Sequence, residues 1–211
     1  MNRVDIPSLK TRWTLVKRLK DLDDSKSWTT FYDTYANLIY GFALKAGLNH
    51  TEAQEALQET VIEVSKRIPR FHAERKSGSF KSWLCKLASW KIGDQFKKRR
   101  RNQRLTANGT TETESNPFEL DTFVDPSTSS ELERLWVSEW ENHLIYRTLA
   151  ALDRQVPTEH YQIFLLLVRD EAAPASVAES FGYSVSRIYV IKHRISKRFA
   201  KIYQSILAQE S

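Results

Sequence analysis

The amino-acid sequence predicts an all-α protein made of two small helical domains, which a flexible acidic linker joins. Glycine and proline are scarce, with 6 of each in 211 residues. Apolar residues recur three or four positions apart over long stretches, which is the period of a helix with one buried face. Between the two helical parts lies a stretch rich in serine, threonine, asparagine and acids, with Arg104 as its only cation. These observations place the domains at residues 1–101 and 131–211, and the linker at residues 102–130.

The first domain is expected to begin with a short basic helix at residues 11–22 and a longer helix at residues 28–46. Ser27 is expected to cap the N-terminus of the longer helix. Gly47 is expected to end it, because glycine tolerates the left-handed conformation that often follows a helix. A third helix is expected to open at Thr51 and to end at Pro69, which removes a backbone donor.

The third predicted helix has an acidic face. Its buried stripe is expected to consist of Leu57, Val61, Val64 and Ile68. Its other faces carry Glu52, Glu55, Gln58, Glu59 and Glu63. Such a face is either an ordinary solvated surface or a docking surface for a basic or mixed protein partner, and the residues alone leave both interpretations open.

The loop at residues 69–79 is basic and contains two candidate DNA contacts, Phe71 and His72. An aromatic ring among cations can hold an unstacked base, but a solvated connector fits the loop equally well. The helix predicted at residues 80–101 then separates an apolar face from a polar one. The apolar face consists of Phe80, Trp83, Leu84, Leu87 and Ala88. The opposite face consists of Ser82, Lys86, Ser89, Gly93 and Lys97.

This helix ends in five consecutive cations, which are Lys97, Lys98, Arg99, Arg100 and Arg101. Like charges in a row repel one another, so we expect an anionic partner, and the phosphates of a nucleic acid fit best. A localisation-like basic run or a solvated helix end is the alternative. Trp90, on the same helix, either completes the core or offers a stacking surface for a base.

The second domain is predicted to contain a helix-turn-helix. Ala178, Gly182 and Ile188 have its spacing: a small residue lets two helices cross closely, a glycine takes the turn, and a branched apolar residue anchors the second helix. Ser184 is expected to cap that second helix. The exposed face of the second helix suits a major groove and consists of Ser186, Arg187, Tyr189, Val190, Lys192, His193 and Arg194. A plain helical hairpin in a core is the alternative.

Two helices are expected before this motif, at residues 131–152 and from Pro157 onward. Their inward-facing residues are predicted to be Leu132, Leu135, Trp136, Trp140, Leu144 and Ile145 in the first helix, and Tyr161, Phe164, Leu165 and Val168 in the second.

Bulk features narrow the function classes. The formal net charge of +6 favours a polyanionic partner. The single cysteine, Cys85, excludes an internal disulfide and is expected to be a small buried hydrophobe. The five histidines lack ligand spacing, and no phosphate loop or hydrolase motif is present, so we expect no enzyme activity, no metal and no cofactor. The longest strictly aliphatic and aromatic run spans residues 163–168, so we expect a cytoplasmic protein without membrane insertion.

Four segments of the chain have a recognisable order: WTTFYDTYANLIYGFA, EALQETVIEV, GSFKSWLCKLASWKIGDQFKKRRR and SVSRIYVIKHRISKRF. In this order they resemble bacterial RNA polymerase sigma factors of the extracytoplasmic-function group, over about residues 11–203. Trp90 and Gly93 depart from the resemblance, because relatives often carry small polar or basic residues there.

The resemblance implies a sigma factor that binds core RNA polymerase and directs promoter recognition and transcription initiation. Glu55, Gln58 and Glu59 would dock on the clamp helices of the largest polymerase subunit. The helix at residues 80–101 and the loop before it would bind and open the minus-ten element of promoter DNA, and the C-terminal helix would read the minus-thirty-five element. The resemblance also allows for an anti-sigma factor as a partner. A helix-turn-helix regulator that acts without core polymerase is the alternative function.

Overall fold

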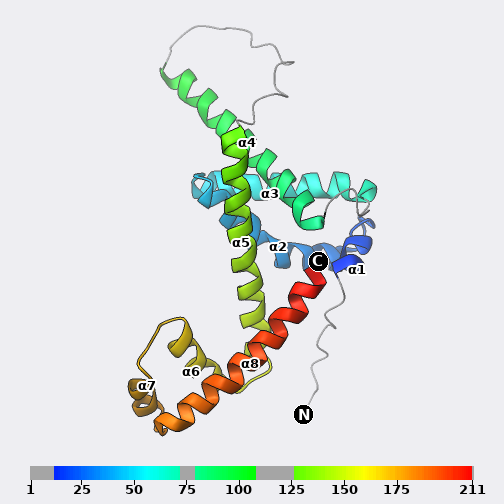
Figure 1. Ribbon diagram of the computed structural model, residues 1–211. Coiled ribbons are helices and arrows are strands. Elements are labelled where there is room, and N and C mark those ends of the chain that lie inside the picture. The colour runs from blue at the N-terminus through cyan, green and yellow to red at the C-terminus, as the bar shows by residue number, and fades with distance from the viewer. Residues whose placement is uncertain (1–11, 72–78, 108–125, 211) are drawn as a thin grey trace. The chain divides into compact units, whose positions relative to one another are not determined.

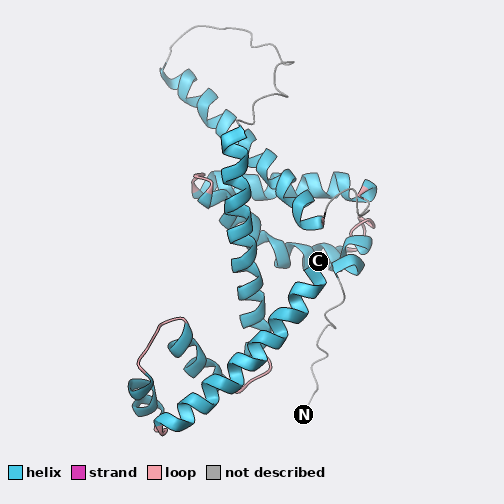
Figure 2. Ribbon diagram, viewed as in Figure 1, coloured by secondary structure: helices cyan, strands magenta, loops and turns pink. Residues whose placement is uncertain are grey.

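The computed structural model describes residues 12–71, 79–107 and 126–210, and these residues form helices and the turns that join them (Figures 1 and 2). The α-helices are α1 (Arg12–Arg18), α2 (Ser25–Lys45), α3 (His50–Arg67), α4 (Phe80–Ala107), α5 (Pro126–Asp153), α6 (Thr158–Val168), α7 (Pro174–Phe181) and α8 (Val185–Glu210). A short 3-10 helix, η1 (Ile68–Arg70), follows α3. The predicted all-α class is confirmed. The chain divides into two compact units, residues 1–140 and 141–211.

The starts of α2 and α3 differ slightly from the predicted ones. Asp24, not Ser27, caps α2, and its carboxylate accepts hydrogen bonds from the Ser27 backbone nitrogen at 3.1 Å and the Ser27 hydroxyl at 2.8 Å. Hydrogen bonds from Arg18 and from Ser27 lower the pKa of Asp24 to about 2. Helix α3 begins at His50, one residue before the predicted Thr51, and Asn49 caps it in a capping box with Glu52. Gly47 has a φ of +98° after α2, which confirms its predicted role.

An aromatic cluster forms the core of the first unit. The ring of Phe80 lies 5.7 Å from Tyr35, 6.5 Å from Phe31 and 5.5 Å from Trp83, measured between centroids. Of the stripe predicted for α3, Leu57, Val64 and Ile68 are buried, whereas Val61 is half-buried. Cys85 is buried, as predicted, and burial raises the pKa of its thiol to about 11.

The first half of α5 belongs to the first unit, which shifts the predicted boundary at residue 131. Trp136 packs edge-on against Phe42 at 5.2 Å, and Trp140 stacks on Tyr35 at 6.4 Å, because the two tryptophans lie one turn apart on the same face. Both are buried. Helices α4 and α5 also extend into the predicted linker, to residue 107 and from residue 126, while residues 108–125 lie outside the described part of the chain.

In the second unit, α6, α7 and α8 pack together around the predicted helix-turn-helix. Ala178 and Ile188, the predicted crossing and anchor residues, are buried, and so are Val177 and Ile191. Gly182 has a φ of +65°, and a Cβ there would meet nothing within 4 Å, so the turn requires glycine for its backbone conformation and not for space.

Two inward-facing predictions in the second unit are wrong. Ile145 of α5 and Val168 of α6 are 42% and 49% exposed. The buried stripe of α5 advances by four residues through Trp136, Trp140, Leu144 and Thr148, which leaves Ile145 one position out of phase. In α6 the buried residues are Ile163, Phe164 and Leu167.

Candidate nucleic-acid interface

One face of α4 presents cations and a tryptophan to solvent. Lys86 and Lys97 are exposed, and Trp90 is 47% exposed, so the ring does not complete the core. Ser89 and Gly93 are half-buried beside them. The face opposite carries the predicted apolar residues, of which Phe80, Leu84, Leu87 and Ala88 are buried and Trp83 is half-buried. The predicted division of this helix into an apolar and a polar face is confirmed.

The basic end of α4 meets the acidic face of α3. Arg99 donates from Nε to Glu52 at 2.7 Å and also bonds the other Glu52 oxygen through Nη2. Lys98 lies 2.5 Å from the Glu55 carboxylate. Gln95 donates to Glu59 at 3.3 Å. Along α3 the paired residues run from Glu52 to Glu59, while their partners on α4 run backwards from Arg99 to Gln95. The two helices therefore pack antiparallel.

These pairs shift the acid–base properties of both partners. The hydrogen bond from Arg99 holds the pKa of Glu52 below its ordinary value, and the hydrogen bond to Glu55 raises the pKa of Lys98. The anionic partner predicted for the cation run is therefore supplied, for two of the five cations, by α3 itself. Arg100 and Arg101 are exposed, and the Lys97 ammonium lies 3.9 Å from Asp94.

The residues predicted to bind polymerase do not share one environment. Glu55 and Glu59 contact α4, whereas Gln58 is exposed. From the sequence alone, the acids of α3 and the cations of α4 are expected to form two separate surfaces, whereas the structure pairs them. A signal in the sequence could have indicated this pairing. Acids at positions 52, 55 and 59 of one helix match polar or basic residues at positions 99, 98 and 95 of the other, in antiparallel order.

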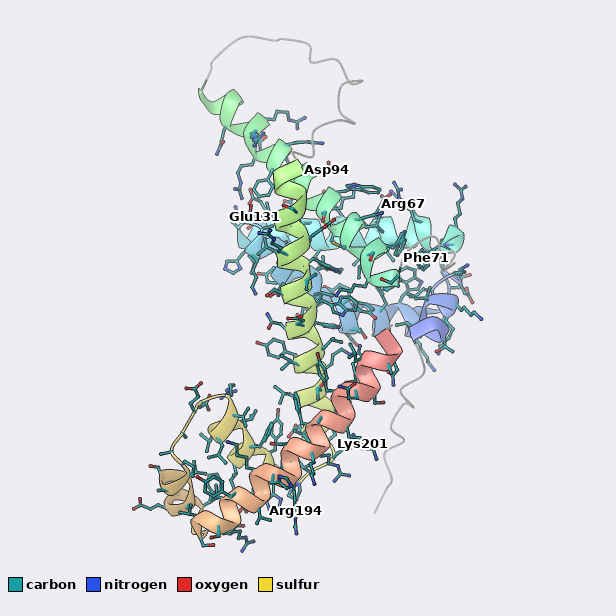
Figure 3. All side chains as sticks on the ribbon, viewed as in Figure 1. Arg67, Phe71, Asp94, Glu131, Arg194 and Lys201 are labelled. Carbon is teal, nitrogen blue, oxygen red and sulfur yellow. The ribbon has the colours of Figure 1, made fainter. Side chains whose placement is uncertain are left out.

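The loop prediction for Phe71 is not supported. Phe71 is 7% exposed, and its ring lies 4.7 Å from the ring of Trp83 and 5.9 Å from that of Phe80. Packing therefore occupies the ring, which anchors the end of η1 to the start of α4 and is not open to a base. Figure 3 marks Phe71 at this junction, with Arg67 nearby on α3. His72 lies outside the described residues.

The start of α8 presents the face predicted to read DNA. The exposed residues are Ser186, Arg187, Tyr189, Val190, His193 and Arg194, while Lys192 is half-buried. Ser184 accepts a hydrogen bond from the Arg187 backbone nitrogen at 3.3 Å, which confirms the predicted cap. The Arg187 guanidinium lies 3.8 Å from the centre of the Tyr183 ring. Figure 3 shows Arg194 and Lys201 farther along the same helix.

Within the described ranges, no three histidine, cysteine or acidic side chains gather in a way that could hold a metal ion. Over the same residues, no helix combines the length and apolar character needed to cross a bilayer.

Comparison with known families decides the identity of the first unit. Residues 31–102 match the family model for sigma-70 region 2. This range runs from α2 through α4 and contains both the acidic face of α3 and the exposed face of α4. Residues 31–102 of the first unit thus correspond to a sigma-70 region 2 domain. The resemblance to sigma factors drawn from the sequence is thereby confirmed for the first unit.

Three solved structures of complexes align with most of this chain at low sequence identity. CnrH, solved with the cytosolic domain of CnrY, is 12% identical, with 91% of this chain and 96% of that chain covered and a TM-score of 0.35. The aligned chain of the RsbN–BldN complex is 16% identical. The alignment covers 89% of this chain and 98% of that chain, with a TM-score of 0.31. The sigma factor RpoE in complex with the anti-sigma factor NepR from Bartonella quintana is 13% identical. The alignment covers 85% of this chain and 98% of that chain, with a TM-score of 0.33. No curated protein sequence matches this chain significantly.

Proposed function

We propose that this protein is a sigma factor of the extracytoplasmic-function group, which binds core RNA polymerase and directs it to promoters. The observation that carries the proposal is the presence, in one chain, of a sigma-70 region 2 domain and a separate helix-turn-helix unit. The protein acts by binding and not by catalysis, and it works in the cytoplasm.

In this proposal the two units read different promoter elements. The exposed face of α4, with Lys86, Trp90 and Lys97, binds the minus-ten element, where strands must separate. The start of α8, with Arg187 and Tyr189, reads the minus-thirty-five element in the major groove. Each face is basic and exposed on its own unit, which supports the assignment. The polymerase holds the two readers at the spacing of the promoter.

Helix α3 docks on polymerase in this proposal, through Gln58 together with the outer edges of Glu55 and Glu59. The Glu55 side chain remains 40% exposed although it pairs with Lys98, so a cation of a partner protein can still approach it. Glu59→Lys reverses a charge on this face and is expected to lower affinity for core polymerase. Titration of labelled protein with purified core measures the effect, and intact binding would place the interface elsewhere.

In vitro transcription with purified core polymerase tests the proposed function. The expected result is initiation from a subset of a genomic promoter library, dependent on added protein. Tight and specific operator binding without polymerase, with no initiation, would favour the helix-turn-helix regulator instead. A pull-down from the native cell would show whether polymerase and an anti-sigma factor accompany the protein.

A further inference from the structure

We infer that Tyr183, which Glu159 holds in place, positions the Arg187 guanidinium to read a base pair in the major groove of duplex DNA. Tyr183 stands between Gly182 and Ser184, in the turn of the helix-turn-helix, and Glu159 lies in the first turn of α6. The inference rests on the proposed function and adds to it a positioning residue, which acts on specificity through Arg187.

The first observation is the closeness of the cation to the ring. The Arg187 guanidinium carbon lies 3.8 Å from the centre of the Tyr183 ring. This is a contact distance between carbon atoms, so the guanidinium lies over the face of the ring and not beside its edge. In three other cation–ring pairs of the described chain, the cation lies 5.2 Å from the ring centre. The side chain of Arg187 is therefore held in one place more closely than those cations are.

The second observation is that the ring itself is fixed at both ends. The Tyr183 backbone nitrogen donates to the Ala178 carbonyl at 2.9 Å, a hydrogen bond that closes the end of α7. At the other end, the Tyr183 hydroxyl donates to the Glu159 carboxylate, which raises the pKa of the phenol above its ordinary value of 10.0. The hydroxyl is therefore a donor at neutral pH. The half-buried ring is thus tied to α7 and α6, which both pack on α8 (Figure 1).

The third observation concerns Arg187, which is fixed at its backbone and open at its tip. Its backbone nitrogen donates to the Ser184 hydroxyl at 3.3 Å, in the first turn of α8, and its side chain is exposed. A guanidinium stacked on an aromatic ring engages the ring through its face and keeps the N–H groups at its edge for a bidentate contact. Paired acceptors on a base edge in the major groove fit this fork, and the first turn of a recognition helix is the part that reaches them.

The stacking has a consequence for binding. A free arginine side chain loses much rotamer freedom when it forms a fixed contact, whereas a stacked one has lost part of it beforehand. Removal of the Tyr183 ring is therefore expected to weaken the contact that Arg187 makes and to leave other contacts with DNA unchanged. A tyrosine with a purely structural role would instead affect the stability of the unit, and binding to all sequences alike.

Sequence selection from a duplex library with a randomised segment tests the inference. The full chain is used alone and with purified core polymerase, and affinities for the selected sequence and its single-base-pair variants give a discrimination profile. Arg187→Ala is expected to lower discrimination at the base pair it contacts by roughly 5- to 150-fold. Tyr183→Leu is expected to lower discrimination at that same base pair by roughly 2- to 30-fold, and to cause no further loss when it is combined with Arg187→Ala.

Conservative variants and a matched control accompany this test. Tyr183→Phe and Glu159→Ala both remove the hydrogen bond and keep the ring, so most of the discrimination is expected to remain. Tyr203→Leu is the matched control, because Tyr203 is a half-buried tyrosine far along α8 whose ring stacks on that of Phe199 at 6.3 Å. It is expected to give the wild-type profile. Urea unfolding of each variant separates a loss of folding from a loss of positioning.

A Tyr183→Leu variant that keeps the wild-type profile, or that loses further discrimination when Arg187 is absent, overturns the inference. A wild-type chain that selects no sequence overturns it as well. Transcription by the same preparations separates the two proposals. Initiation together with an unchanged Tyr183→Leu profile removes only the positioning role. Coupling of Tyr183 and Arg187 on a sequence selected without polymerase, with no initiation, removes only the sigma factor role.

Discussion

Helices α4 and α8 both carry dense runs of cations, but they hold these charges in different ways. In α4, Arg99 and Lys98 turn toward Glu52 and Glu55 of α3. In α8, Arg187 and Arg194 are exposed to solvent, and Arg187 lies on the ring of Tyr183. Cation density along a helix therefore does not measure the number of DNA contacts, because part of the charge can serve the fold.

The largest expected effect concerns α8. Under the proposed function, Arg187→Ala should weaken promoter binding by the polymerase complex by about 1–3 kcal/mol and relax base specificity, since it removes an exposed donor at the start of α8. Competition among minus-thirty-five variants measures this. Lys201→Ala, an exposed cation far along α8, serves as the control. Unchanged discrimination among the variants would contradict the placement of Arg187 in the groove.

The next effect separates two kinds of cation within α4. Replacing Arg100 and Arg101 together by alanine should reduce the steepness of log binding constant against log salt by about 2, because the proposed phosphate contacts of two exposed cations are removed. Replacing Lys98 and Arg99 together should leave the slope close to that of the wild type, since both already have acidic partners. Equal slopes for the two double variants would show that the cations paired with α3 and the exposed cations contribute to DNA binding alike.

A smaller effect is expected on stability. Arg99→Ala should lower the free energy of unfolding by about 1 kcal/mol, after allowance for solvent screening, because it leaves the largely covered Glu52 carboxylate without its partner. Arg100→Ala should change stability by less than about 0.5 kcal/mol. Urea unfolding followed by circular dichroism measures both. If the two single variants unfolded at the same urea concentration, the ion pair would not stabilise the fold.

The smallest effect is a dependence on pH. Arg99 lowers the pKa of Glu52 below its ordinary value of 4.5 in the folded state. The contribution of this pair is therefore complete above pH 4.5 and is lost as pH falls through the lower folded value. Glu52→Gln keeps an oxygen that can accept from the Asn49 backbone, so it is the matched control and should reduce the acid sensitivity. Thermal unfolding between about pH 3 and pH 6 compares the two chains. Identical acid profiles would show that other carboxylates dominate.

Features that depend on residue spacing within one helix or turn could be predicted from the sequence. Ala178, Gly182 and Ile188 were identified from their spacing, because a helix-turn-helix needs a small residue, a positive φ and an apolar anchor at fixed intervals. The exposed face of α8 followed from the same period. These features require no knowledge of which segment packs on which.

Features that depend on contacts between distant segments were missed. Arg99 and Glu52 are 47 positions apart, and periodicity shows that each helix has a polar face without showing that the two faces meet. The basic neighbours of Phe71 predict a DNA contact, but in the structure its ring packs against Phe80 and Trp83. The cap of α2 is Asp24, three residues before the predicted Ser27, because several capping residues stand close together at that helix start.

The burial of Cys85 makes the protein well suited to site-specific labelling. With a pKa of about 11, the thiol is ionised in only about one molecule in ten thousand at neutral pH, and the thiolate is the reactive form toward maleimides. A cysteine introduced at an exposed position such as Tyr32 or Lys201 would therefore react first, with the native residue left in place. A pair of such labels, one on each unit, would report by energy transfer how the separation of the units changes when polymerase is added.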